Sequence, residues 1–307
     1  MEDAWVLARR QDTLWTRARM IQAIRRFFSA RCYLEVETPY RIPAPAPEYH
    51  IDAVASGNWF LHTSPELCMK RLLAAGYPRI FQICKCFREG ERGSCHLPEF
   101  TMLEWYHQDI DYRILMEECE ELVIFVASDL GCKEVINYRD QEIALRRPWE
   151  MLSLREAFGC YAPLSLAEAL QRGKFDEIVS YYIAPHIGEG RPTFLYDYPL
   201  YSSTLTGTKR EEPSVEERFE LYIGGMEVAN GSSELTDVDE QQLRFERARQ
   251  SRYLQGKMVY PLPERFLQAF PTMPKAAGIA LGVDRLAMIF TDSPTIDEVV
   301  MFTPEYI

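Results

Sequence analysis

Acidic, phenolic and aromatic side chains alternate along the segment PEFTMLEWY at Pro98–Tyr106. Residues two apart on a β-strand share a face, so a strand here presents Phe100, Met102, Glu104 and Tyr106 together. The preceding strand and the loop that follows it add the charged residues Arg88, Glu89, Glu91, Arg92 and His96. This face is suited to bind a cation beside an anion, with Phe100 stacking a base. Periodicity alone also allows an amphipathic hairpin with one solvated face.

A second predicted hairpin turns at Gly224-Gly225, a dipeptide typical of two-residue turns. This turn pairs Tyr222 with Glu227 and Glu220 with Ala229. Glu220 and Glu227 then share a face, with their backbones about 7–8 Å apart. Two such carboxylates can hold Mg²⁺, which prefers oxygen ligands and keeps water for a nucleotide's phosphates. The alternative is two solvated acids on an exposed sheet. Two further polar residues follow at the strand's end, Asn230 and Glu234.

The small-residue run GIALGVDR, residues 278–285, predicts a strand that leads directly into a helix. It places Arg285 in the first turn of the helix, where a guanidinium can bind phosphate through two hydrogen bonds. The alternative is that Asp284 caps the helix and Arg285 lies in solvent. The chain has neither GxxxxGK[ST] nor GxGxxG. If ATP binds, we therefore expect it to lie on a sheet.

The elements that would position these residues follow from periodicity and turn residues. We predict helices at 12–31, from Ser64-Pro65-Glu66 onward, at 111–130 and at 239–253; strands at 33–39, 79–88 and 98–107; a helical insertion near 159–187; and a mobile loop or lid at 201–213. The whole chain, 1–307, is interpreted as one α+β catalytic domain with an antiparallel sheet flanked by helices.

Composition excludes several classes of protein. The 307 residues are 47% hydrophobic and carry a net charge of −12, which argues against binding the backbone of a nucleic acid. No stretch approaches the ~20 apolar residues of a membrane span, and the start MEDAWVLARR lacks the basic end and apolar run of a signal peptide. We expect a cytoplasmic protein whose eight cysteines are reduced thiols.

The run HLPEFTMLEWY, the run GIALGVDRL and the helix at 12–31 with its following strand resemble motifs 2, 3 and 1 of class II aminoacyl-tRNA synthetases. The lysyl branch is most similar. Only eleven residues precede the helix, so we expect no anticodon-binding domain. A lysyl-type catalytic core of this length resembles the elongation factor P–lysine ligases. The resemblance implies a homodimer that activates a lysine-type amino acid with ATP and Mg²⁺ and transfers it to a lysine of elongation factor P, without stable tRNA binding.

The resemblance implies a role for each matching position. The amino acid would be bound by Ser64, Pro65, Glu66, Glu104, Tyr106, Asn230, Glu234 and Ala280. ATP would be bound by Arg88, Glu89, Gly90, His96, Leu97, Phe100, Glu227, Val228, Gly282 and Arg285, and Mg²⁺ by Glu220 and Glu227. Three of these, Arg88, Glu227 and Arg285, are expected to be catalytic because charge builds on the phosphoryl oxygens during activation.

The chain departs from the usual pattern at a few positions. Gly90 and Leu97 stand where Glu and Asn are common, and Ser232 where lysyl enzymes often have Phe, so the adenine contact and the pocket wall are expected to differ. Ala280 stands where lysyl-tRNA synthetases commonly have Gly, and its methyl is expected to favour (R)-β-lysine over α-lysine. Two alternatives stay open: a truncated lysyl-tRNA synthetase-like enzyme acting on tRNA, and a non-catalytic paralogue that binds amino acid or nucleotide.

Overall fold

An eight-stranded sheet runs through the protein in the computed structural model, which describes residues 8–201 and 203–307. The strand order is β1-β5-β6-β13-β12-β11-β10-β9. Neighbouring strands are antiparallel except at the two edges, where β1 pairs with β5 and β9 with β10 in parallel. The strands span β1 Leu34–Glu35, β5 Arg79–Phe87, β6 Glu99–Gln108, β9 Glu150–Ser153, β10 Thr193–Pro199, β11 Val215–Ile223, β12 Met226–Ser233 and β13 Ala276–Gly282.

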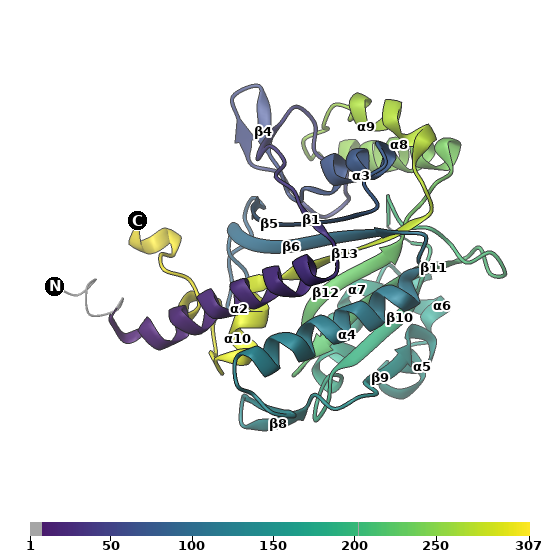
Figure 1. Ribbon diagram of the computed structural model, residues 1–307. Helices are drawn as coiled ribbons and strands as arrows, with labels where there is room; N and C mark the ends of the chain where they lie inside the picture. Colours follow the sequence, from purple (N-terminus) through teal and green to yellow (C-terminus); the bar gives the residue numbers. More distant parts are fainter. Residues whose placement is uncertain (1–7, 202) are drawn as a thin grey trace.

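Two long helices, α2 (Gln11–Ala30) and α4 (Tyr112–Asp129), cover one face of this sheet (Figure 1). The odd-numbered side chains of β6, such as Trp105, point into the core beneath them, where Phe28 stacks on Phe81. The buried residues of α2, Met20, Ala23, Ile24, Phe27 and Phe28, belong to the core that α4 and the sheet of the same chain form, so this part of the helix needs no partner chain to cover it.

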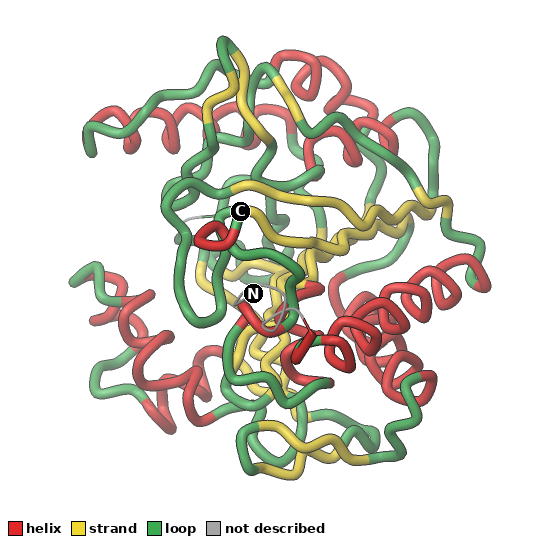
Figure 2. Tube along the Cα trace, turned by 90° about the vertical axis from the view of Figure 1, so that its left-hand side faces the viewer, coloured by secondary structure: helices red, strands yellow, loops and turns green. Residues whose placement is uncertain are grey.

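Helix α10 (Val283–Phe290) packs against α2 in the same core. The other helices lie around the opposite face and the ends of the sheet, and Figure 2 shows helices on both sides of the strands. The predicted insertion is helical, as expected. The other helices are α3 Glu66–Ala74, α5 Leu154–Tyr161, α6 Leu166–Gln171, α7 Phe175–Ile178, α8 Val238–Leu254 and α9 Glu264–Ala269; two small sheets contain β2 Arg41–Ile42, β3 Ala55–Ser56 and β4 Trp59–Leu61, and β7 Val135–Tyr138 and β8 Gln141–Ala144.

The second hairpin contains an irregularity that the sequence did not predict. Tyr222 pairs with Glu227 as expected, but the register then shifts, so that Glu220 faces Asn230 rather than Ala229. A bulge inserts one residue into a strand and shifts every later side chain by one position. It therefore brings Asn230 onto the face that carries Glu220 and Glu227.

Part of the loop predicted at 201–213 is hydrogen-bonded to its neighbours. Gln241 and Arg244 donate hydrogen bonds to carbonyls of residues 204 and 206, and the Gly207 N–H donates to Ser233 O. Residues 1–7, which carried most of the argument against a signal peptide, lie outside the described residues.

None of the helices in the described part of the chain is long and apolar enough to cross a membrane.

Candidate active site

A cavity of about 560 Å³ opens on the face of the sheet opposite α2 and α4. Its floor consists of the even-numbered side chains of β6 together with residues of β11, β12 and β13. Its walls come from the loop at 48–51, from the insertion at 175–180 and from residues 203–206. The insertion, to which the sequence assigned no chemistry, therefore lies against the cavity.

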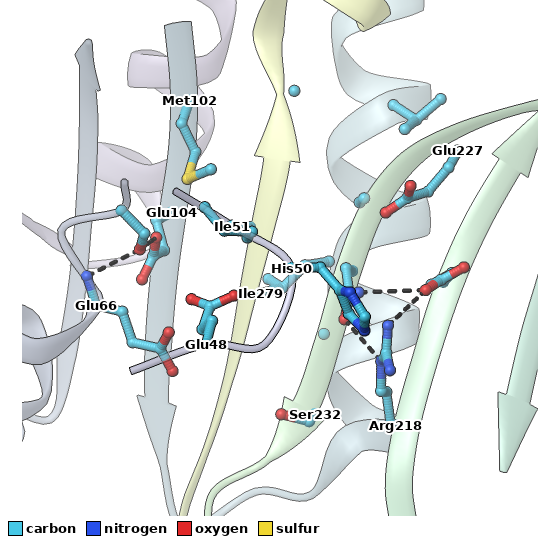
Figure 3. Close-up of a pocket in the computed structure, with 18 of the residues that line it drawn as sticks. Glu48, His50, Ile51, Glu66, Met102, Glu104, Arg218, Glu227, Ser232 and Ile279 are labelled. Atoms are coloured by element: carbon cyan, nitrogen blue, oxygen red, sulfur yellow. Dashed lines mark hydrogen bonds and ion pairs between the residues drawn. The ribbon is translucent and has the colours of Figure 1, made fainter. Parts of the chain in front are cut away.

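One end of this cavity is acidic. Glu48, Glu66, Glu104 and Glu234 all line it, and Figure 3 shows the first three turned into the same part of the cavity. Glu66 and Glu234 both contact the ammonium of Lys70, whose Nζ lies 2.6 Å from Glu66 Oε1. Among the described residues, Lys70 is the only cation that forms an ion pair with any of the four. The end of the cavity therefore has an excess of negative charge.

The pKa values of these acids reflect that excess. Burial, reinforced by the charge of Glu66, raises the pKa of Glu104 to about 8 and that of Glu48 to about 7. Burial likewise raises the pKa of Glu234 to about 7, although Lys70 opposes the rise. Burial alone would lower the pKa of Lys70, but Glu234 and Glu66 raise it overall. A bound ammonium group would relieve these unfavourable interactions.

Glu104 is held in position by two donors. The Ser64 hydroxyl donates to Oε2 at 2.7 Å, and the Tyr106 hydroxyl donates to Oε1 at 2.5 Å. Ser64 Oγ also accepts from the Glu66 N–H at 3.0 Å, which ties the start of α3 to the strand β6. The carboxylate of Glu104 is thus fixed before any ligand arrives.

Small residues of β13 make room for these groups. A Cβ on Gly278 would lie 2.2 Å from the Tyr106 ring and 2.6 Å from Glu234 Oε1, so only glycine fits there. Two residues on, Ala280 pairs with Glu104 on one side and Asn230 on the other, and its methyl lies at the cavity floor. The sequence placed Ala280 correctly at the cavity but did not identify the role of Gly278.

The other end of the cavity contains the guanidinium groups of Arg88 and Arg285, which pair with Glu91 and Glu227. Phe100, Arg88, His96 and Arg285 line it, and the Arg88 guanidinium lies 5.0 Å above the centre of the Phe100 ring. Arg88 Nε is buried and has no hydrogen-bond partner among the described residues. At about 3.4 Å per strand residue, Phe100 and Glu104 are about 14 Å apart along β6. The two ends of the cavity are therefore well separated.

Arg285 is fixed by several groups. It donates to Glu227 O at 2.8 Å, and its Nη2 lies 2.6 Å from His96 Nε2. Burial, together with Arg285, lowers the pKa of His96, so the neutral imidazole accepts this hydrogen bond. The neighbouring Asp284 does not cap α10. It is buried, accepts from Arg17 of α2 at 2.6 Å and from the Thr101 N–H of β6 at 2.7 Å, and so joins three elements.

Glu220 and Glu227 are the carboxylates considered for Mg²⁺. Burial, then the charge of Glu227, raises the pKa of Glu220, although Arg218 opposes the rise. Arg218 forms an ion pair with Glu220, and Arg285 forms one with Glu227. Oxygen donors of this kind fit Mg²⁺, which commonly takes one or two carboxylates and completes its shell with phosphates and water. Glu227 is the more available ligand, because Glu220 already accepts from Arg218, Tyr222 and Asn230.

Most residues proposed from the sequence line the cavity. These are Ser64, Glu66, Arg88, His96, Leu97, Phe100, Glu104, Tyr106, Glu220, Glu227, Val228, Asn230, Glu234, Ala280, Gly282 and Arg285. Pro65, Glu89 and Gly90 do not line it: Pro65 is the buried N-cap of α3, and the other two are exposed in the loop after β5. Asn230 does line it, but its amide is bonded to Glu220 and Arg218 rather than to the acidic end.

Sequence reasoning missed three charged groups. Lys70 stands four residues after Glu66 on α3, a spacing at which helical side chains meet, so a signal was present. Arg218 alternates with Glu220 on β11 and bonds to it at 2.6 Å. Glu48 gave no signal, because it lies in a proline-rich loop without periodicity.

A family profile described as "tRNA synthetases class II (D, K and N)" matches residues 4–305. The chain belongs to this class II synthetase family. Its catalytic fold is accordingly the α+β fold of that family, and the chain is an enzyme of the ligase type. This chain is 37% identical to a protein of Mannheimia succiniciproducens named "Elongation factor P--(R)-beta-lysine ligase", over 98% of each chain. It is 38% identical to a protein of the same name from Salmonella typhi, over 94% of each chain.

A third relative carries a different name. The class II chain is 36% identical to "Lysine--tRNA ligase" of Moorella thermoacetica, and the match covers 94% of this chain but 64% of that protein.

Proposed function

We propose that the protein activates a lysine-type amino acid, (R)-β-lysine, with ATP and transfers it to a lysine of elongation factor P. The names of two relatives that match over nearly their full length support the amino acid and the acceptor. The polarity of the cavity supports the chemistry. Its acidic end suits a substrate with two amino groups, and the two arginines at its other end suit a triphosphate about 14 Å away along β6. This separation of charge is the observation that carries the proposal.

In the first step, a carboxylate oxygen of the amino acid attacks the α-phosphorus of ATP. The bond from that phosphorus to the bridging oxygen breaks, and pyrophosphate leaves. Negative charge builds on the phosphoryl oxygens during this step, so fixed cations near them accelerate it. Arg88, whose buried Nε has no partner within the described chain, is assigned to the α-phosphate, and Arg285 with His96 to the outer phosphates.

The other residues position the two substrates. Phe100 stacks the adenine, and Glu104 and Glu234 bind the far ammonium, with Tyr106 orienting Glu104. Mg²⁺, when bound by Glu227 and Glu220, supplies further charge neutralisation on the phosphates. No side chain acts as a nucleophile. Catalysis on this proposal consists of positioning and electrostatic stabilisation.

In the second step, the ε-amino nitrogen of the acceptor lysine attacks the carbonyl carbon of the adenylate. The acyl–phosphate bond breaks, AMP leaves, and the amine loses a proton to solvent. Relative to α-lysine, (R)-β-lysine has its near amino group displaced by one carbon. The Ala280 methyl at the cavity floor occupies the space that an α-amino group needs, which favours the β isomer.

ATP–pyrophosphate exchange tests this proposal directly. We expect exchange that depends on added amino acid and is fastest with (R)-β-lysine, and ATP-dependent addition of that amino acid to purified elongation factor P, read by mass spectrometry. Absence of exchange with every lysine isomer would show a binding protein without turnover. Charging of tRNA with unmodified elongation factor P would instead assign the activity named for the Moorella relative.

Two further expectations complete the proposal. We propose a cytoplasmic location and a homodimer, whose interface would use exposed apolar residues at the edge of α2 and β1. Trp15 is 70% exposed and Leu34 49% exposed. Light scattering at micromolar concentration is expected to give the dimer mass, and a monomer would contradict it.

A further inference from the structure

Two thiols and an imidazole meet beside the cavity. Cys84 and Cys86 lie on the same face of β5, and their sulfur atoms are 3.9 Å apart. The His62 side chain joins them, so that ligand atoms of all three residues lie within 4.8 Å of one another. All three side chains are buried. The amino-acid and nucleotide sites proposed above use none of them.

The spacing fits a thiolate metal centre. Two thiolates that bind one zinc ion at about 2.3 Å in tetrahedral geometry have their sulfur atoms about 3.8 Å apart. The distance of 3.9 Å between Cys84 and Cys86 is close to this value. A disulfide would instead need the sulfur atoms to approach to about 2 Å, which two residues on one face of an extended strand oppose.

The imidazole of His62 is oriented by a hydrogen bond to a backbone carbonyl, as is usual for histidines that bind metals. Its Nε2 lies 2.7 Å from Lys85 O, a carbonyl that can only accept, so Nε2 carries the hydrogen and Nδ1 has a free lone pair. Its backbone is anchored at both ends, because its N–H donates to Tyr40 O and its carbonyl accepts from the Phe87 N–H. The imidazole therefore does not need to be ordered when an ion binds.

A fourth soft donor is nearby, since the Met102 thioether lies 3.9 Å from Cys86 Sγ.

We propose that His62, Cys84 and Cys86 form a binding site for a thiophilic metal ion, Zn²⁺ or Cu⁺, at the side of the cavity. Nitrogen and sulfur donors of this kind bind both ions, and a thioether as fourth neighbour favours Cu⁺. Met102 lines the cavity and contacts Cys86, so it marks the route by which an ion enters. The cluster also packs against Phe100 and Ala280, so occupancy would stiffen the floor under both substrates.

The test measures metal binding and does not depend on the proposed activity. The full chain, reduced with a non-thiol reductant, is titrated separately with Zn²⁺ and with Cu⁺ against a chromogenic chelator of known affinity. We expect one ion per chain, and at least ~100-fold weaker binding by Cys86→Ala and His62→Gln, the upper end of what loss of even an outer-shell partner costs. Cys119→Ala removes a buried thiol of α4 outside the cluster and is expected to bind as the wild type does.

A second measurement covers the case in which a variant fails to fold. In the wild-type protein, the ion is expected to slow alkylation of Cys84 and Cys86, mapped by peptide mass spectrometry, while alkylation of the exposed Cys32 is unchanged. Failure of both ions to bind the reduced protein would overturn the proposal. So would equal binding by folded His62→Gln, or protection that does not fall on these two cysteines.

Discussion

Replacing Glu104 by glutamine separates the electrostatic role of this residue from its packing. Glu104 is 3% exposed and accepts hydrogen bonds from Ser64 and Tyr106. Glutamine has the same shape, can accept from Tyr106 through its oxygen, and can donate to Ser64 through its nitrogen. The substitution therefore removes the charge that we assign to the substrate's far ammonium and leaves the packing in place.

The expected effect on activity follows from the burial of this group. Loss of one partner of a buried, hydrogen-bonded charge pair costs about 2–5 kcal/mol, or about 30-fold to 5,000-fold in kcat/KM. We expect Glu104→Gln to lose amino-acid-dependent pyrophosphate exchange by a factor in this range. Glu99→Gln is the matched control, because Glu99 lies on the same strand with its side chain 55% exposed. Exchange within threefold of the wild type would refute the assignment of Glu104.

Glu104→Gln is expected to lower activity but to raise the free energy of unfolding near pH 8. The pKa of Glu104 rises from the model-compound value of 4.5 to about 8, so the folded protein holds a proton that the unfolded chain releases. Stability is therefore lost as the pH rises from about 4.5 to 8, by at most about 5 kcal/mol at ~1.4 kcal/mol per pH unit. Glu104→Gln should flatten this dependence in thermal unfolding and unfold no earlier than the wild type at pH 8. A variant that is much less stable at pH 8 would contradict the argument from burial.

Three further predictions concern the pH dependence of activity, the ion pairs of Lys70 and the methyl group of Ala280. Because a bound ammonium needs ionised carboxylates, kcat/KM for the amino acid should rise between about pH 6 and 8, and a flat profile would argue against the raised pKa values of Glu104 and Glu234. Lys70→Met should destabilise the protein by about 3–5 kcal/mol in denaturant unfolding, since Glu66 and Glu234 lose their shared partner. Ala280→Gly should raise kcat/KM for α-lysine relative to (R)-β-lysine by about 5-fold to 150-fold, and an unchanged ratio would show that the methyl does not select the isomer.

The sequence determined the faces of the strands that form the cavity floor. Period-two alternation placed Phe100, Met102, Glu104 and Tyr106 together, and the structure confirms that they share one face. Small residues at 278–282 predicted a strand that leads into a helix, and β13 and α10 confirm it. These features depend only on the geometry of a single strand or turn, so local sequence is sufficient to predict them.

Tertiary structure decided which distant residues meet. Glu66 and Glu234 are far apart in the chain, and they share Lys70 only because α3 lies over the sheet in which β6, β13 and β12 are neighbours. The bulge in β12 changed the partner of Glu220, because register depends on the neighbouring strands as well as on the turn. Glu48 reached the cavity through a loop whose path is set by packing rather than by a repeating pattern. Local chemistry thus came from the sequence, whereas the excess of acid at one end of the cavity arose from long-range contacts.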